Sequence, residues 1–331
     1  MTSSDGEDDR HDDEDDRLER WRQQSTFDVE HWYELLRGHT AETAIVPLPA
    51  DVARALVASY RHRFLRRDEP TEAQLTALRE YTARLQQDCA AMESEGFFVR
   101  LGSRSPKDAE AAVATREAYD AELQRRTVED GAEDGYGTAD DSCNAQLRAY
   151  FEVAHQALRV RSAEAAVALL CSSERVCRDV ERSLASGVAM SVCLRAWQPA
   201  LRQEYEFRGF VCGGKLTHVS QYNPYVHTPQ VVASRDDTLA TLERFWREEI
   251  DPRLRARYGS YIVDFALLST GDVVVVELNP FDEQTGGGLF RWEDPDDRAL
   301  MERGPLGLRM ATRPRQHMQA TIEVFVAELR T

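Results

Sequence analysis

The 331-residue sequence lacks the features of membrane-spanning and secreted proteins. Its longest apolar stretches, such as Tyr261–Leu268, are far shorter than the ~20 residues that cross a bilayer. The first residues are polar and acidic, so no secretory signal peptide is expected there. The six cysteines include no CxxC pair and no zinc-ligand spacing with histidine, which indicates free thiols in a reducing compartment. These absences favour a soluble, cytoplasmic protein.

Motifs of several enzyme and binding classes are also absent. The sequence has no GxSxG elbow, no HExxH and no GxxxxGK[ST] phosphate loop. No basic stretch with interleaved aromatic residues occurs, so direct binding of nucleic acid is not expected. Catalytic residues therefore remain unassigned.

Negative charge is concentrated at the N-terminus. Residues 1–20 hold ten acidic residues and three arginines, and so supply −7 of the net charge of −17. Such a segment cannot bury apolar surface, which predicts a disordered acidic tail over residues 1–24. The tail either keeps the protein soluble or contacts a basic partner.

Hydrophobic periodicity and turn residues predict the elements of the remaining chain. Predicted helices span Phe27–Arg37, Asp51–Tyr60 with Asp51 as its cap, Thr71–Met92, Lys107–Arg126, Arg235–Arg257 and Gln316–Leu329, with broken helices from Ala145 to Leu184. Predicted strands span Ile45–Pro49, Phe97–Leu101, Val188–Trp197, Glu204–Cys212, Lys215–Gln221, Tyr261–Leu268 and Asp272–Leu278. A helix-rich half followed by a mixed half indicates an α+β chain with lobes at residues 25–190 and 191–331.

The last predicted hairpin brings three oxygen-bearing side chains together. With Thr270-Gly271 as its turn, Asp264 faces Glu277, and Asn279 lies on the same side of the sheet. Two carboxylates that close must share a proton or a cation, and two carboxylates with an amide suit magnesium. Acids on a solvent-facing strand, or a register changed by a bulge, are the alternative. The opposite, apolar face would consist of Val263, Phe265, Leu267, Val274, Val276 and Leu278.

The loop after the strand Phe97–Leu101 is a candidate phosphate site. Arg100 on the strand is followed by Gly102–Lys107, in which small residues stand beside two further cations. Backbone N–H groups and positive charge in such a loop can hold phosphate. An ordinary polar loop is the alternative.

Charges also alternate along the strand that precedes the turn Gly213-Gly214. Glu204, Glu206 and Arg208 share one face of this strand, and the two-residue turn places Glu206 opposite Gln221. Without further evidence, a salt-bridged surface is the preferred explanation of this pattern, and a functional site is the alternative.

The three candidate segments occur in the order found in the cell division cycle protein 123 family, which the sequence resembles. The resemblance extends over residues 27–295. It is carried by Trp32-Tyr33, Ile45–Pro49, Val99–Ala109, Leu169-Leu170, Ser172-Ser173, Arg178-Asp179, Leu194–Trp197, Glu206–Val211, Val219–Gln221, Val263-Asp264, Leu278–Phe281 and Leu289–Glu293.

This resemblance implies an ATP-grasp fold in which two lobes clamp ATP. The residues that it implies for ATP are Arg100, Ser103, Ser105, Pro106 and Arg208 at the phosphates and Arg195, Ala196 and Trp197 near the adenine. It assigns Mg²⁺ to Asp264, Glu277 and Asn279.

The resemblance further implies a cytoplasmic, monomeric assembly chaperone of eukaryotic translation initiation factor 2, which binds the gamma subunit of that factor. The alternative function is an ATP-grasp ligase that forms an amide or peptide bond through an acylphosphate. Whether ATP is hydrolysed stays open.

Several positions depart from the family pattern. The family usually has lysine at the position of Arg100 and an aromatic residue at the position of Ser103. It usually has arginine where this chain has Tyr222, and aspartate where this chain has Glu277. The usual Thr-Asp-Ser step is Thr285-Gly286-Gly287, and residues 116–160 resemble an insertion.

Overall fold

The structure is a computed structural model that describes residues 18–92, 94–132 and 135–330. Most of the predicted acidic tail, residues 1–17, lies outside the described residues. Residues 18–24 are helical, and Trp21 in this helix is buried, so predicted disorder is wrong for this part. Among the described residues, every helix is too short or too polar to cross a membrane.

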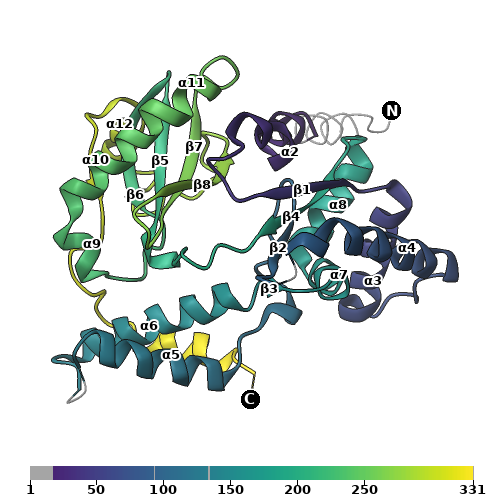
Figure 1. Cartoon of the computed structure of the whole chain (residues 1–331), viewed down its shortest axis with the longest axis horizontal. Coiled ribbons are helices and arrows are strands. Elements are labelled where there is room, and N and C mark those ends of the chain that lie inside the picture. Colours follow the sequence, from purple (N-terminus) through teal and green to yellow (C-terminus); the bar gives the residue numbers. More distant parts are fainter. Residues whose placement is uncertain (1–17, 93, 133–134, 331) are drawn as a thin grey trace, which may run out of the picture. The chain divides into compact units, whose positions relative to one another are not determined.

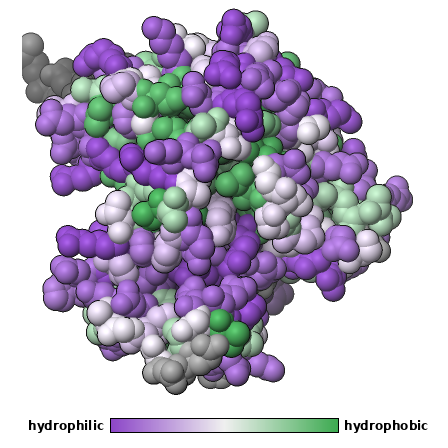
Figure 2. Space-filling view, turned by 60° about the vertical axis from the view of Figure 1, so that its left-hand side comes forward, coloured by the Kyte–Doolittle hydropathy of each residue, from purple (hydrophilic) through white to green (hydrophobic). Residues whose placement is uncertain are grey.

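The described chain is an α+β protein that divides into two compact units (Figure 1). Unit 1 comprises Met1–Trp32, Thr43–Ala111 and Val160–Ala196, and unit 2 comprises Tyr33–Glu42, Ala112–Arg159 and Trp197–Thr331. The predicted lobe boundary at residue 190 lies inside the last segment of unit 1. Hydrophilic residues dominate the face in Figure 2, as the charged composition leads one to expect.

Unit 1 is built on a sheet of strand order β1-β4-β2-β3, which are Thr43–Pro47, Ser191–Ala196, Phe97–Leu101 and Arg159–Val160. Its helices include α2 (Val29–Trp32), α3 (Ala50–Leu65), α4 (Glu72–Cys89), α7 (Ala163–Cys171) and α8 (Glu174–Ser186). Helix α4 begins with a capping box between Thr71 and Gln74. The predicted cap of α3 is wrong, because Pro49 holds the N-cap position and Asp51 lies inside the helix.

Unit 2 contains a sheet of order β8-β7-β5-β6-β9, which are Val273–Asn279, Tyr261–Leu267, Glu206–Cys212, Lys215–Gln221 and Leu308–Arg309. Its helices include α9 (Pro229–Ala233), α10 (Arg235–Phe245), α11 (Asp251–Leu254) and α12 (Pro295–Arg303). A π-helical turn, Trp246–Ile250, joins α10 to α11, so the predicted helix Arg235–Arg257 is confirmed as one interrupted element. Phe210, Ile262 and Met301 form part of the core between α12 and the sheet.

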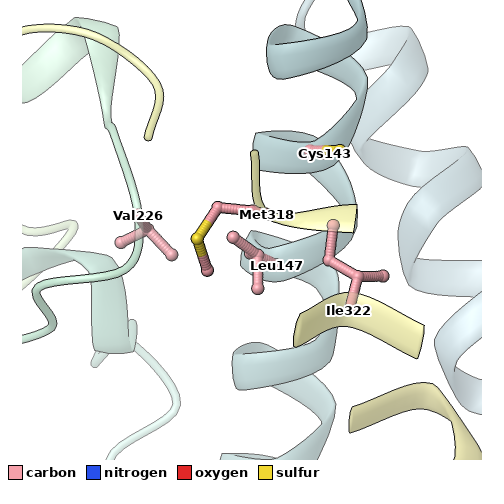
Figure 3. Packing of buried hydrophobic residues seen from close by; sticks show 5 residues of the cluster. All are labelled: Cys143, Leu147, Val226, Met318 and Ile322. Atoms are coloured by element: carbon pink, nitrogen blue, oxygen red, sulfur yellow. The ribbon is translucent and has the colours of Figure 1, made fainter. Parts of the chain in front are cut away.

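The segment that resembles an insertion forms the antiparallel helices α5 (Arg116–Glu129) and α6 (Ala139–Gln156). The predicted helix Lys107–Arg126 starts late, because Thr115 caps α5. The final helix α13 (Gln319–Ala327) packs on α6. Figure 3 shows Met318 and Ile322 beside Leu147 of α6, with Val226 completing the cluster. The C-terminal segment therefore fixes α6 to the loop after β6.

Glu204 is buried rather than on a surface strand face, which corrects its predicted position. It lies in a short helical turn, and its carboxylate accepts from Arg126 at 2.9 Å and from Arg148 at 2.8 Å. Burial alone would raise the pKa of Glu204, but the surrounding arginines lower it to about 2. This ion cluster ties α5 and α6 to the start of β5.

Candidate functional site

Strands β7 and β8 place Asp264 directly opposite Glu277, and Asn279 opposite Ile262. The predicted facing of the two carboxylates is confirmed, although the predicted turn is wrong. The loop has three residues, because Leu268 donates its N–H to the carbonyl of Asp272 at 2.8 Å. A bulge after Asp264 shifts the register by one residue and restores the pairing. The longer loop and the bulge each shift the register by one residue in opposite directions, so the predicted pairing at the candidate site is kept.

The same bulge changes which valines of β8 are buried. Val275 is buried, whereas Val276 and Val274, which were predicted for the apolar face, are only partly buried, as is Leu267. The backbone of Val275 binds a distant segment instead: its N–H donates to the carbonyl of His39 at 2.8 Å and its carbonyl accepts from Thr40 Oγ1 at 2.7 Å. The predicted apolar face is correct for Val263, Phe265 and Leu278, which are buried.

Arg208 on β5 lies beside Asp264 in the sheet, so three neighbouring strands present Arg208, Asp264 and Glu277 in one row. The guanidinium holds both carboxylate oxygens of Asp264, with Nε to Oδ1 and Nη2 to Oδ2 each at 2.8 Å. Its Nη1 donates to the carbonyl of Gly286, and the ring of Tyr222 lies 4.9 Å from its Cζ. The guanidinium is therefore held on several sides.

The buried charges of this row compensate one another. Arg208 and Asp264 are both buried. Burial alone would lower the pKa of Arg208, but the charge and hydrogen bonds of Asp264, with help from Glu277, raise it above the ordinary value. The Arg208–Asp264 pair is neutral as a unit, and Glu277 adds a negative charge next to it.

This donor set fits magnesium bound together with phosphate. The described residues contain no group of three His, Cys, Asp or Glu side chains that could hold a metal alone. Mg²⁺ in nucleotide sites commonly takes one or two carboxylates and fills its remaining positions with phosphate oxygens and water. Asp264 retains lone pairs beyond those that accept from Arg208, Glu277 is partly exposed, and Asn279 contributes an amide oxygen. Its Nδ2 lies 3.4 Å from Asp264 Oδ2.

The predicted pairing of Glu206 with Gln221 is wrong. The turn Gly213-Gly214 forms as predicted, with positive φ at both glycines. A bulge between Phe210 and Val211 then shifts the strands, so that Phe207 faces Gln221.

In unit 1, the candidate phosphate loop is held by internal contacts. Arg100 is buried, and its Nε and Nη2 donate to the carbonyls of Leu101 at 2.9 Å and Gly102 at 3.3 Å. Ser103 Oγ donates to Asp179 Oδ2 at 2.9 Å, and Arg104 Nε donates to the same oxygen at 3.1 Å. Ser105 and Pro106 are buried. Asp179 on α8, one of the residues that carry the family resemblance, thus fixes the loop.

Two further acids, Asp28 and Glu30, pack against this loop, and the sequence did not indicate them. Asp28 is 5% exposed, and the N–H of Val29 donates to the carbonyl of Gly102 at 3.2 Å. A Cβ at Gly102 would lie 1.8 Å from Glu30 Oε2, so any larger residue there would displace the Glu30 carboxylate. Burial, reinforced by the charge of Glu30, raises the pKa of Asp28 to about 8, although Arg100 opposes the shift.

This raised pKa predicts a pH dependence of stability. Between pH 5 and 8 the folded chain retains a proton on Asp28 that the unfolded chain has released, so the free energy of unfolding falls as pH rises. One such proton gives a slope of about −1.4 kcal/mol per pH unit. Asp28→Asn should remove this contribution, which urea unfolding at several pH values measures. Equal slopes for the variant and the parent would contradict the assignment.

The predicted adenine segment crosses the boundary between the units. Arg195 and Ala196 end β4 in unit 1, and the Cζ of Arg195 lies 5.7 Å from the ring of Trp32. Trp197 begins a segment of unit 2, where its ring lies 4.8 Å from that of His155. Unit 1 thus holds the candidate phosphate loop, and unit 2 holds Arg208 and the metal-ligand candidates.

Comparison with known proteins gives consistent matches. The D123 family model matches residues 148–324. A Candida albicans protein named as a translation initiation factor eIF2 assembly protein is 24% identical over 143 residues, which are 39% of this chain and 40% of that protein. The chain thus matches less than half the length of this curated relative.

Solved structures support the fold. Cdc123 from Schizosaccharomyces pombe, whole and C-terminally truncated, superposes with a TM-score of 0.58 at 17% identity, covering 87% of this chain and 96% of that one.

Proposed function

The chain belongs to the D123 family, and from this premise we propose that it assists the assembly of eukaryotic translation initiation factor 2 by binding the gamma subunit of that factor while it holds ATP and Mg²⁺. The name of the Candida albicans relative supports the assembly role. The row of Arg208, Asp264 and Glu277 is the observation that carries the nucleotide part of the proposal.

The row and the neighbouring Asn279 offer different groups to the metal and to the phosphates of a magnesium nucleotide. Asp264, Glu277 and Asn279 supply hard oxygen ligands, and Arg208 supplies a fixed positive charge for phosphate. When bound, Mg²⁺ would neutralise phosphate charge. In unit 1, Arg100, Ser103, Ser105 and Pro106 are proposed to contact phosphate, and the segment Arg195–Trp197 to contact adenine.

A binding role explains the site without a catalytic residue. In this proposal, ATP stabilises the form of the chain that recognises the gamma subunit, and the bound nucleotide need not be consumed. A ligase would in addition need a pocket that holds the acceptor beside the terminal phosphate.

Copurification tests the proposed function. Tagged chain, with MgATP present, should retain the purified gamma subunit of eIF2 at micromolar concentration. A parallel assay should find no release of ADP stimulated by any member of an amino-acid and peptide panel. Failure to retain the subunit would reject the assembly role, and stimulated ADP release would instead favour a ligase.

A further inference from the structure

A surface pocket of about 460 Å³ in unit 2 is lined by three arginines and, as far as the described residues extend, by no acidic residue. We define it as the arginine pocket; its lining includes Tyr225, Leu289, Arg291, Arg313, Pro314 and Arg315. Its volume falls within the ~300–1,000 Å³ typical of ligand sites. A basic pocket is unexpected in a chain whose net charge is −17.

Buried Gln221, at the end of β6, fixes two walls of the pocket. Its Nε2 donates to the carbonyls of Asn223 at 2.6 Å and Val226 at 2.7 Å, which sets the loop that carries Tyr225. Its Oε1 accepts from the N–H of Ala311 at 3.2 Å, next to the segment of Arg313 and Arg315. One side chain thus holds both segments in place.

The neighbouring Ser220 fixes the third wall. Its Oγ accepts from the N–H of Leu289 at 2.9 Å. Gly288 has a φ of +64°, and a Cβ there would lie 2.5 Å from Ser220 Oγ. The pair Ser220-Gln221, which belongs to the motif Val219–Gln221, therefore shapes the pocket before any ligand binds.

The three arginines keep their charges available. All three are exposed, and among the described residues none of them forms a salt bridge. Arg315 stacks on Tyr225, with its Cζ 5.3 Å from the ring centroid. Nearby Arg309 differs, because it is paired with Asp297 at 2.6 Å. Within the described part of the chain, no ion pair thus neutralises the positive charge of the pocket.

The arrangement of these charges favours an extended ligand. Arg313 and Arg315 lie on an irregular segment at the surface, and Arg291 lies on a separate one. A compact phosphate site would have a buried cation or converging backbone N–H groups, whereas guanidinium groups spread over a surface suit successive carboxylates. Tyr225 and Pro314 offer apolar contact between them. We propose that the arginine pocket binds an acidic peptide segment of a partner protein.

This proposal is independent of the nucleotide site, and its test contains neither ATP nor magnesium. The probe is a fluorescein-labelled twelve-residue peptide rich in glutamate, compared with a peptide in which glutamine replaces each glutamate. Fluorescence anisotropy measures binding to the full chain and to the variant Arg291→Gln, Arg313→Gln, Arg315→Gln. The matched control is Arg247→Gln, Arg298→Gln, Arg303→Gln, which removes the same charge from exposed arginines paired with acids.

The pocket variant should bind the glutamate peptide at least about ten-fold more weakly, and the control variant should lose less than about two-fold. Added salt should weaken binding of the parent, because exposed charges are screened. The site would be overturned if both variants lost the same affinity for the glutamate peptide, or if the parent bound the glutamine peptide as tightly as the glutamate peptide. Displacement of the peptide by millimolar inorganic phosphate would overturn the peptide assignment in favour of a small anion, and no binding by the parent chain would overturn both.

Discussion

Replacing Asp264 by Asn together with Glu277 by Gln abolishes magnesium-dependent binding of ATP. The two substitutions keep the side-chain volumes but remove both negative charges that face each other across β7 and β8. An amide is a weaker ligand for Mg²⁺ than a carboxylate, so the proposed site would lose the charge that is expected to hold the ion. Isothermal titration with ATP, in excess magnesium and again in EDTA, measures the effect.

The matched control for this variant is Asp236→Asn with Glu283→Gln, because both residues are exposed and the change in net charge is the same. It should bind ATP as the parent does. Asp264→Asn also disturbs the buried pair with Arg208, so Glu277→Gln alone serves as the second variant. It should fold normally and bind ATP at least about ten-fold more weakly in magnesium. Parent-like affinity in this folded single variant would refute the metal site.

Replacing Arg208 by methionine lowers the free energy of unfolding by about 3–5 kcal/mol, the usual effect of leaving one partner of a buried ion pair alone. Arg208 and Asp264 are both buried, and the guanidinium holds both oxygens of the carboxylate. Urea unfolding at pH 7 measures the loss.

Two further variants serve as controls for the stability measured with Arg208→Met. Arg298→Met removes an exposed arginine paired with Glu302 at 3.0 Å and should change stability by less than about 1 kcal/mol. Adding Asp264→Leu to Arg208→Met should recover part of the lost stability, because no unpaired charge then remains buried. A loss no larger than that of Arg298→Met would mean that the pair does not stabilise the fold.

The sequence predicts local elements better than their register. Alternating apolar residues are sufficient to predict β5, β6, β7 and β8 to within a few residues. The bulge in β8 adjoins Val275, whose backbone binds His39 and Thr40, more than 200 residues away in the chain. Strand periodicity contains no information about such contacts. The pairing of Asp264 with Glu277 was predicted correctly although the predicted turn is wrong, because the bulge offsets the extra residue of the loop.

The positions of buried charged residues are likewise not predictable from the sequence pattern. Glu204 has the pattern of an exposed strand residue, yet Arg126 and Arg148 reach it from α5 and α6. Asp28 and Asp179 approach the loop after β2 from other parts of unit 1. Asp179 lies in a segment that carries the family resemblance, but no spacing in the sequence indicates that either acid contacts this loop. Their positions follow from tertiary packing alone.

The central claim is that a bound magnesium nucleotide promotes recognition of the gamma subunit. The most direct test is the affinity of the chain for the purified gamma subunit of eIF2, measured with MgATP and without nucleotide. We expect at least about ten-fold tighter binding with MgATP, a coupling of about 1.4 kcal/mol, and loss of this gain in Glu277→Gln. Equal affinity in both conditions, while calorimetry shows that the nucleotide is bound, would contradict it.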